Sequence, residues 1–290
     1  MQEILKDIGK RCGGDIYLGI VGPVRVGKSS FIKRFMEVAV IPYIEDSDAK
    51  IRAIDELPQS GEGRMIMTVE PKFIPNQAAH IQVDDNLSAN VRLVDCVGYV
   101  IEGAKGYQDD SGIRQVKTPW YLEAIPFDEA ARIGTKKVIA DHSTIGIVVT
   151  CDGSICDIDV KDYQKATDDI IKELKAIGKP FVIVVNSTDP RSITCNELVE
   201  NLKQKHQVPT IPLKVNEMNE NDIAYLLKEA LFEFPVHEVK IEVPRWIAMM
   251  DNAHWLKQTL DEALKKSISS IHRFRDVEII ADNISQFQCH

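Results

Sequence analysis

Residues 22–29 combine residue types and a spacing suited to holding a phosphate group. They read Gly-Pro-Val-Arg-Val-Gly-Lys-Ser. Glycines let a backbone turn its N–H groups toward an anion, while the lysine ammonium reaches the β- and γ-phosphates and the serine hydroxyl holds Mg²⁺. The alternative is a chance glycine turn before a helix. All eight positions match, and they lie after an apolar run and before a helical pattern. This context favours a nucleotide phosphate-binding loop.

Asp95 and Gly98 form a second element, DxxG, after an apolar run. In nucleotide switches this aspartate holds Mg²⁺ through water, and the glycine N–H meets the γ-phosphate. Ras-like switches commonly continue with a glutamine that orients the attacking water, but here the next residue is Tyr99. Either another group positions the water or intrinsic hydrolysis is slow. The alternative role for Tyr99 is packing under the switch.

Thr68 and Arg25 are further candidates for contact with the γ-phosphate. Thr68 lies at the end of the polar loop at 43–64, where a switch would become ordered. A threonine at this place can complete the Mg²⁺ shell. Arg25 lies inside the phosphate loop, and we hypothesise that its guanidinium acts as an internal arginine finger. An outward-pointing arginine on the rim of the loop is an equally supported interpretation.

The nucleotide base is expected to be read by Asn186-Ser187-Thr188-Asp189, which follows an apolar run at 181–185. In the NKxD motif the aspartate pairs with the guanine edge and the lysine stem covers the ring. Ser187 replaces that lysine, so the stacking stem is missing. Asp189 keeps guanine possible, because an edge reader made of polar groups discriminates strongly. From these residues alone the base stays undecided.

The elements that position these residues alternate regularly along the chain. Apolar runs that predict strands lie at 16–21, 90–94, 144–150, 180–185 and 210–215, with a further strand pair at 65–73 and 80–83. Helical patterns lie at 29–39, 128–141, 161–177, 195–205 and 220–234, whereas 98–127 lacks periodicity and is expected to be functional or disordered. The alternation predicts an α/β P-loop NTPase fold, with a mainly parallel sheet, helices on both faces and the nucleotide at the carboxyl ends of the strands.

Composition excludes several function classes. The net charge of the 290 residues is −9, which disfavours nonspecific nucleic-acid binding. No run is long enough for a transmembrane segment, and the N-terminus has no signal-peptide core. The six cysteines form no CxxC pair, which indicates reduced cytosolic thiols.

The pattern changes after residue 235. A strand is predicted at 237–243 and a long amphipathic helix at 246–286. We therefore predict a nucleotide-binding domain over 1–235 and, over 236–290, the start of a largely helical middle region of a longer protein. The alternative is a terminal helix folded back on the same domain.

Several sequence blocks together resemble the stage IV sporulation protein A family. Besides the phosphate loop with Arg25, they are GGDIYLG (13–19), DELPQS (55–60), EPKF (70–73), PNQA (75–78), LVDCVGY (93–99), TPWY (118–121), HSTIG (142–146) and EFPV (233–236). The resemblance implies a translational-factor (TRAFAC) GTPase-like fold that binds and hydrolyses ATP with Mg²⁺. It also implies that hydrolysis drives self-assembly of the spore coat basement layer, in the mother-cell cytoplasm at the outer surface of the forespore. The implied partners are other copies of the chain, a small amphipathic membrane-associated spore protein and other coat proteins.

The same resemblance assigns roles to individual residues. Lys28 is the phosphate-loop lysine, Asp95 the Mg²⁺-linked carboxylate and Thr68 the γ-phosphate sensor. The family often has a second threonine at the sensor, where this chain has Val69, and Asp189 is more typical of guanine recognition than the family suggests.

The prediction is therefore a slow, Mg²⁺-dependent ATPase that drives assembly, with a regulatory GTPase switch or a non-catalytic nucleotide-binding scaffold as alternatives. The predicted nucleotide-binding residues are Gly22, Val24, Arg25, Val26, Gly27, Lys28, Ser29, Ser30, Gly98, Asn186 and Asp189. The predicted catalytic residues are Lys28, Thr68, Asp95 and Arg25, and the predicted metal ligands are Ser29, Thr68 and Asp95.

Overall fold

The computed structural model describes residues 8–9, 11–58, 71–84, 87–96, 98–101, 108–109, 112–118, 121–155, 160–236, 238–269 and 271–277. The chain divides into two compact units, Met1–Ala230 and Leu231–His290. Thr68, Val69 and most of the strand predicted at 65–73 lie outside the described residues.

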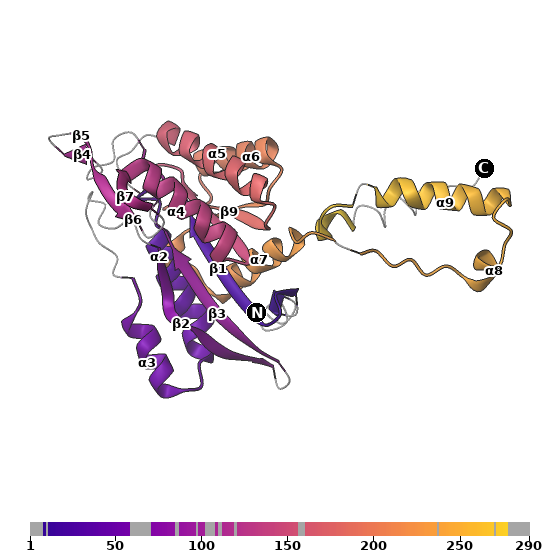
Figure 1. Ribbon diagram of the computed structural model, residues 1–290, viewed down its shortest axis with the longest axis horizontal. Coiled ribbons are helices and arrows are strands. Elements are labelled where there is room, and N and C mark those ends of the chain that lie inside the picture. The colour runs from indigo at the N-terminus through magenta and orange to yellow at the C-terminus, as the bar shows by residue number, and fades with distance from the viewer. Residues whose placement is uncertain are drawn as a thin grey trace. The chain divides into compact units, whose positions relative to one another are not determined.

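A six-stranded sheet forms the centre of the first unit, in the order β10-β9-β8-β1-β3-β2 (Figure 1). Its strands are β1 Asp15–Val21, β2 Lys72–Asp84, β3 Leu87–Asp95, β8 Ile145–Cys151, β9 Phe181–Asn186 and β10 Thr210–Leu213. Neighbouring strands are parallel except β2 and β3, which are antiparallel. The predicted mainly parallel sheet is confirmed. The predicted strand pair is wrong over the described residues, because 72–84 is one strand with a register shift between Ile74 and Ala79 that accommodates Pro75.

The topology brings the carboxyl ends of three strands together. The chain passes from β1 to β3 on one side and returns to β8 on the other side of β1. Such a reversal of strand order opens a crevice beyond the carboxyl ends, where α/β proteins bind ligands. β8 and β9 are buried along their whole length, which explains their continuous apolar sequences.

Helices cover both faces of this sheet. They are α2 Lys28–Phe35, α3 Ser47–Asp55, α4 Phe127–His142, α5 Val160–Ile177, α6 Ile193–His206 and α7 Glu220–Phe232. α4 and α5 contact each other and pack against β1 and β8 respectively, while α2 packs against β1 and β3. A Cβ at Gly19 would lie 2.9 Å from the Ile139 side chain, so glycine permits the close approach of α4 to β1.

Two connecting regions differ from expectation. The helix predicted at 29–39 is α-helical only as far as Phe35. It continues as a π-helical segment, Met36–Val40. The segment 98–127 is not irregular where it is described, because it contains two antiparallel pairs. These are β4 Gln108–Asp109 with β5 Gly112–Ile113, and β6 Gln115–Thr118 with β7 Tyr121–Pro126. Within the part of the chain that the structure describes, none of the helices combines the length and the apolar character that crossing a bilayer requires.

The described residues of the second unit include the helices α8 Arg245–Ala248 and α9 Trp255–Ile268. The strand predicted at 237–243 is wrong, since 238–243 has no regular structure. The long helix predicted at 246–286 is interrupted before α9. There the Asp251 carboxylate accepts from the Ala253 N–H (2.8 Å) and His254 Nδ1 accepts from the Leu256 N–H (3.3 Å). Such local bonds compete with helix continuation and favour a new helix start.

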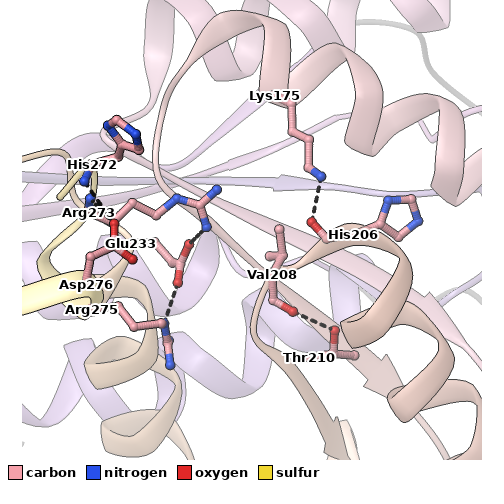
Figure 2. A network of polar contacts seen from close by, with 9 residues as sticks. All are labelled: Lys175, His206, Val208, Thr210, Glu233, His272, Arg273, Arg275 and Asp276. Atoms are coloured by element: carbon pink, nitrogen blue, oxygen red, sulfur yellow. Dashed lines mark hydrogen bonds and ion pairs between the residues drawn. The ribbon is translucent and has the colours of Figure 1, made fainter. Parts of the chain in front are cut away.

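Glu233 joins two distant parts of the second unit (Figure 2). Its side chain is only 4% exposed and accepts hydrogen bonds from Arg273 Nη1 (2.5 Å) and Arg275 Nε (2.9 Å). The rings of Phe232 and Phe274 stack beside this contact with centroids 5.9 Å apart. A carboxylate removed from water requires such paired cations.

We expect Glu233→Ala to loosen this contact. The two guanidiniums are about 40% exposed and can regain hydration, so the expected loss is about 1–2 kcal/mol rather than the larger cost of a fully buried charge. Amide hydrogen exchange at Val236 and Phe274, which bond to His272 O and Phe234 O, should accelerate about tenfold.

The matched control is Glu238→Ala, which removes an exposed carboxylate 3.8 Å from Lys240. Its expected effect on exchange at these amides is nil. Equal exchange in the Glu233 variant and its parent would show that the ion pairs do not hold the segments together.

Candidate nucleotide-binding site

The loop between β1 and α2 is fixed by close backbone approaches. A Cβ at Gly22 would lie 2.0 Å from the carbonyl oxygen of Val149 in β8. Gly27, in the left-handed region with φ of 92°, precedes the first residue of α2, and a Cβ there would lie 2.4 Å from Asn186 Nδ2. Both positions therefore require glycine, and the loop runs directly into the helix N-terminus, where N–H groups attract anions.

Lys28 is buried beneath this loop. Its Nζ donates to Pro23 O (2.7 Å) and Gly22 O (3.3 Å), so the ammonium lies back across the loop that precedes it. Burial lowers the pKa of Lys28, and the nearby Asp95 carboxylate acts in the opposite direction. The result is a partly desolvated cation held against the backbone of the loop.

Ser29 and Asp95 meet at the carboxyl ends of β1 and β3. The Ser29 hydroxyl donates to Asp95 Oδ2 at 2.9 Å. Asp95 Oδ1 is buried and has no hydrogen-bond partner among the described residues. Burial raises the pKa of Asp95, while the Lys28 charge and the Ser29 hydrogen bond lower it. A buried oxygen without a partner is unusual in folded proteins, and a hydroxyl beside a carboxylate suits Mg²⁺, which takes few protein ligands together with phosphates and water.

The residues after Asp95 return to the phosphate loop. Tyr99 N donates to Gly22 O (3.2 Å), and Val24 N donates to Tyr99 O (3.0 Å). A Cβ at Gly98 would lie 2.4 Å from Lys28 Nζ and 2.5 Å from Val24 N. The glycine of DxxG thus lies against the loop lysine, as contact of both with one phosphate requires.

Asn186 connects the end of β9 to the same loop. Its Nδ2 donates to Val26 O at 3.0 Å, and its Oδ1 accepts from Val215 N at 3.2 Å. Beside it, Ser187 Oγ donates to Asp152 Oδ2 at 2.5 Å and accepts from Asp189 N at 3.1 Å. The asparagine therefore holds the phosphate loop, while Asp189 lies exposed beyond it.

The structure brings together most of the residues predicted from sequence. Those in the loop and its immediate contacts are Gly22, Val24, Val26, Gly27, Lys28, Ser29, Asp95, Gly98 and Asn186. Ser30 lies in the first turn of α2, and Asp189 N donates to Ser187, the residue that follows Asn186. Arg25 is half-buried with φ of 70°, a backbone conformation rare for arginine, and Thr68 lies outside the described residues.

Two carboxylates near the site were missed from sequence. Asp152 directly follows β8, which ends at Cys151, and its place at the same sheet edge was the available signal. Glu173 lies mid-helix in α5 and accepts from the Tyr99 hydroxyl (2.6 Å). A charged residue inside an amphipathic helix gives no local sign of this contact.

Comparison with known proteins identifies the family. A protein-family model described as "Stage IV sporulation protein A, ATPase domain" matches residues 1–235, and one described as the middle domain of the same protein matches 236–290. Stage IV sporulation protein A of Bacillus anthracis and of Bacillus subtilis (strain 168) is 50% identical to this chain over 286 residues in each case. That of Clostridioides difficile (strain 630) is 48% identical over 287 residues.

These matches cover 99% of this chain, which spans 58% of the length of each of the three relatives. Among solved structures, translation elongation factor SelB from Methanococcus maripaludis gives a TM-score of 0.40 at 13% identity, covering 74% of this chain and 33% of that one. At that score the likeness bears on neither fold nor function. The resemblance seen in the sequence blocks is confirmed by the two family models, and the chain belongs to the stage IV sporulation protein A family.

Proposed function

We propose that this chain hydrolyses ATP slowly with Mg²⁺, and that hydrolysis drives self-assembly of the spore coat basement layer around the forespore. Family membership and the phosphate loop support nucleotide hydrolysis. The observation that carries the proposal is the contact of Ser29 with Asp95 beside Lys28, where the second Asp95 oxygen is buried and has no partner among the residues that the structure describes. A hydroxyl, a carboxylate and a desolvated ammonium at a helix N-terminus are suited to a metal–triphosphate pair.

Each residue of the site then has a role. Backbone N–H groups of the loop and the α2 N-terminus bind the phosphates, and Lys28 neutralises their charge. Ser29 and Asp95 hold Mg²⁺, which when bound supplies further charge neutralisation. Arg25 is proposed as an additional cation along the phosphates, and Thr68 as the γ-phosphate sensor. Tyr99, lacking an amide, does not orient water as glutamine does.

The assembly part of the proposal follows the family resemblance. One hydrolysis per subunit is sufficient to fix a new conformation, so rapid turnover is unnecessary. The proposed partners are other copies of the chain, a small amphipathic membrane-associated spore protein and other coat proteins. The proposed location is the mother-cell cytoplasm at the outer surface of the forespore.

Phosphate release by the purified chain tests the enzymatic part directly. We expect slow release from ATP in Mg²⁺ and a loss of about 100-fold or more after EDTA, because charge on the phosphates is then uncompensated. Sedimentation with ATP, compared with a non-hydrolysable analogue, tests coupling to assembly. Bound ATP that stays intact in a single-turnover assay would instead support the non-catalytic scaffold.

A regulatory GTPase is the second candidate, because Asn186 and Asp189 retain two positions of a guanine-reading motif. Asn186 is engaged with the phosphate loop, while the Asp189 carboxylate is exposed and accepts from the Arg191 N–H at 3.1 Å. Competition against labelled ATP separates the two. We expect unlabelled ATP to compete at least about tenfold better than GTP, because the family model that matches residues 1–235 is described as an ATPase domain. A clear preference for GTP would overturn the ATP assignment.

A further inference from the structure

Tyr99 contacts both the phosphate loop and a distant helix. Its backbone N–H and C=O are hydrogen-bonded to Gly22 and Val24, while its buried side chain reaches α5. There the phenol donates to Glu173 Oε2 at 2.6 Å, and the other oxygen, Oε1, accepts from Arg132 Nη2 of α4 at 3.2 Å. A continuous set of hydrogen bonds therefore runs from the loop through one residue to α5 and α4.

The phenol–carboxylate bond is suited to holding position. It is short and charge-assisted, and such bonds are roughly twice as strong as neutral ones. Burial raises the pKa of Tyr99, and the hydrogen bond to Glu173 raises it further, so the hydroxyl stays a donor at physiological pH. Because that hydroxyl donates to Glu173 of α5, the Tyr99 side chain does not take the place of the water-orienting glutamine.

Room to move exists beside this bond. Tyr99, Arg132 and Glu173 line a cavity of about 710 Å³ together with Ile101, Asp128 and Lys165. A shift of the segment at 98–101 would stretch the bond, whereas α5 is held by its packing against β8. Gly98, which is next to Tyr99 in sequence, lies against Lys28.

We propose that Tyr99 is a positioning residue, whose hydrogen bond to Glu173 holds Gly98 against Lys28 and couples the phosphate loop to α5. The proposal rests on the proposed function in one respect, namely that the Gly98 N–H contacts the terminal phosphate. The part that concerns the loop and α5 is testable without nucleotide.

Amide hydrogen exchange of the nucleotide-free chain is the first measurement. Tyr99→Phe keeps the ring but removes the hydroxyl, and Glu173→Ala removes its acceptor. Both are expected to speed exchange at the Val24 and Tyr99 amides about tenfold, the factor for loss of one hydrogen bond to a charged group. Glu173→Gln retains an acceptor and is expected to stay within about threefold of the parent.

The matched control is Tyr43→Phe, which removes another phenol that donates to a carboxylate, Glu220 Oε1, at 3.1 Å. It is expected to leave exchange at Val24 and Tyr99 unchanged. The double variant Tyr99→Phe/Glu173→Ala should match Glu173→Ala, because that single variant has already lost the Tyr99 bond together with the contact of Glu173 with Arg132. Unchanged exchange in Tyr99→Phe, or additive effects in the double variant, would overturn the proposal.

Steady-state kinetics is the second measurement. Tyr99→Phe is expected to lower kcat for ATP about tenfold with KM within about twofold, because the loop still binds the phosphates while Gly98 is misplaced. An unchanged kcat, or a loss confined to KM, would count against the positioning role. A parent chain that releases no phosphate refutes the proposed function instead, and the exchange results then decide the coupling alone.

Discussion

Lys28→Ala is expected to lower ATP turnover by about 100-fold or more. Its Nζ already lies across the loop, bonded to two carbonyls and close to Asp95, so it needs little rearrangement to meet a phosphate. Loss of one preorganised donor at a developing charge typically costs two to three orders of magnitude in kcat. Phosphate release under saturating ATP measures the effect, and circular dichroism establishes that the variant is folded.

Lys203→Ala provides the control for the loss of a lysine. Lys203 lies on the surface of α6, where it pairs with Glu200 at 3.1 Å, and its removal should change turnover less than twofold. If Lys28→Ala were folded and turned over ATP like its parent, the loop would not be the catalytic site, and the proposed function would fail.

Gly22→Ala is expected to destabilise the first unit by about 3–5 kcal/mol, at the upper end of single substitutions. The added Cβ would lie 2.0 Å from Val149 O. That contact is with backbone, and the preceding residue, Val21, is paired with Val148 in the β1–β8 ladder. Relief therefore requires separating two central strands rather than turning a side chain. Urea-induced unfolding measures the change.

Gly178→Ala is the matched comparison for a glycine with positive φ. Gly178 has φ of 75° at the end of α5, and an added Cβ would meet nothing within 4 Å. Only backbone strain opposes this substitution, so its expected cost is about 1 kcal/mol. Equal costs for the two variants would mean that the phosphate loop moves away from β8 without penalty.

Much of the first unit could be predicted because the local sequence patterns agree with the burial and close packing that the fold requires. β8 and β9 are continuous apolar runs and are buried on both faces. The loop glycines are required because backbone at Gly22 and the Asn186 side chain at Gly27 lie too close for a Cβ, and their spacing before Lys28 is visible in the sequence. Asp95 and Asn186 end buried strands, and parallel strands necessarily gather such residues at one edge.

The remaining features depend on contacts between residues far apart in sequence. The sequence pattern separated a strand at 65–73 from one at 80–83, but β2 continues through Pro75 because its pairing with β3 tolerates the proline at a register shift. Periodicity over 246–286 suggested one helix, whereas Asp251 and His254 provide local bonds that interrupt it. The partner of Tyr99 lies 74 residues away, in a helix whose own pattern does not distinguish Glu173 from a solvated carboxylate.

The side-chain amide of Asn186 has a consequence for how specificity can evolve in this protein. One carboxamide fastens the phosphate cradle on one side and the backbone of Val215 on the other. Replacement of Asn186 would disturb both the phosphate loop and the contact with Val215. A change in purine preference is therefore expected at residues that hold neither of these parts. Asp189, whose side chain is exposed, is such a residue. Ser187, where the chain departs from the guanine motif, is itself buried and donates to Asp152. Purine preference can thus change while the triphosphate cradle stays intact.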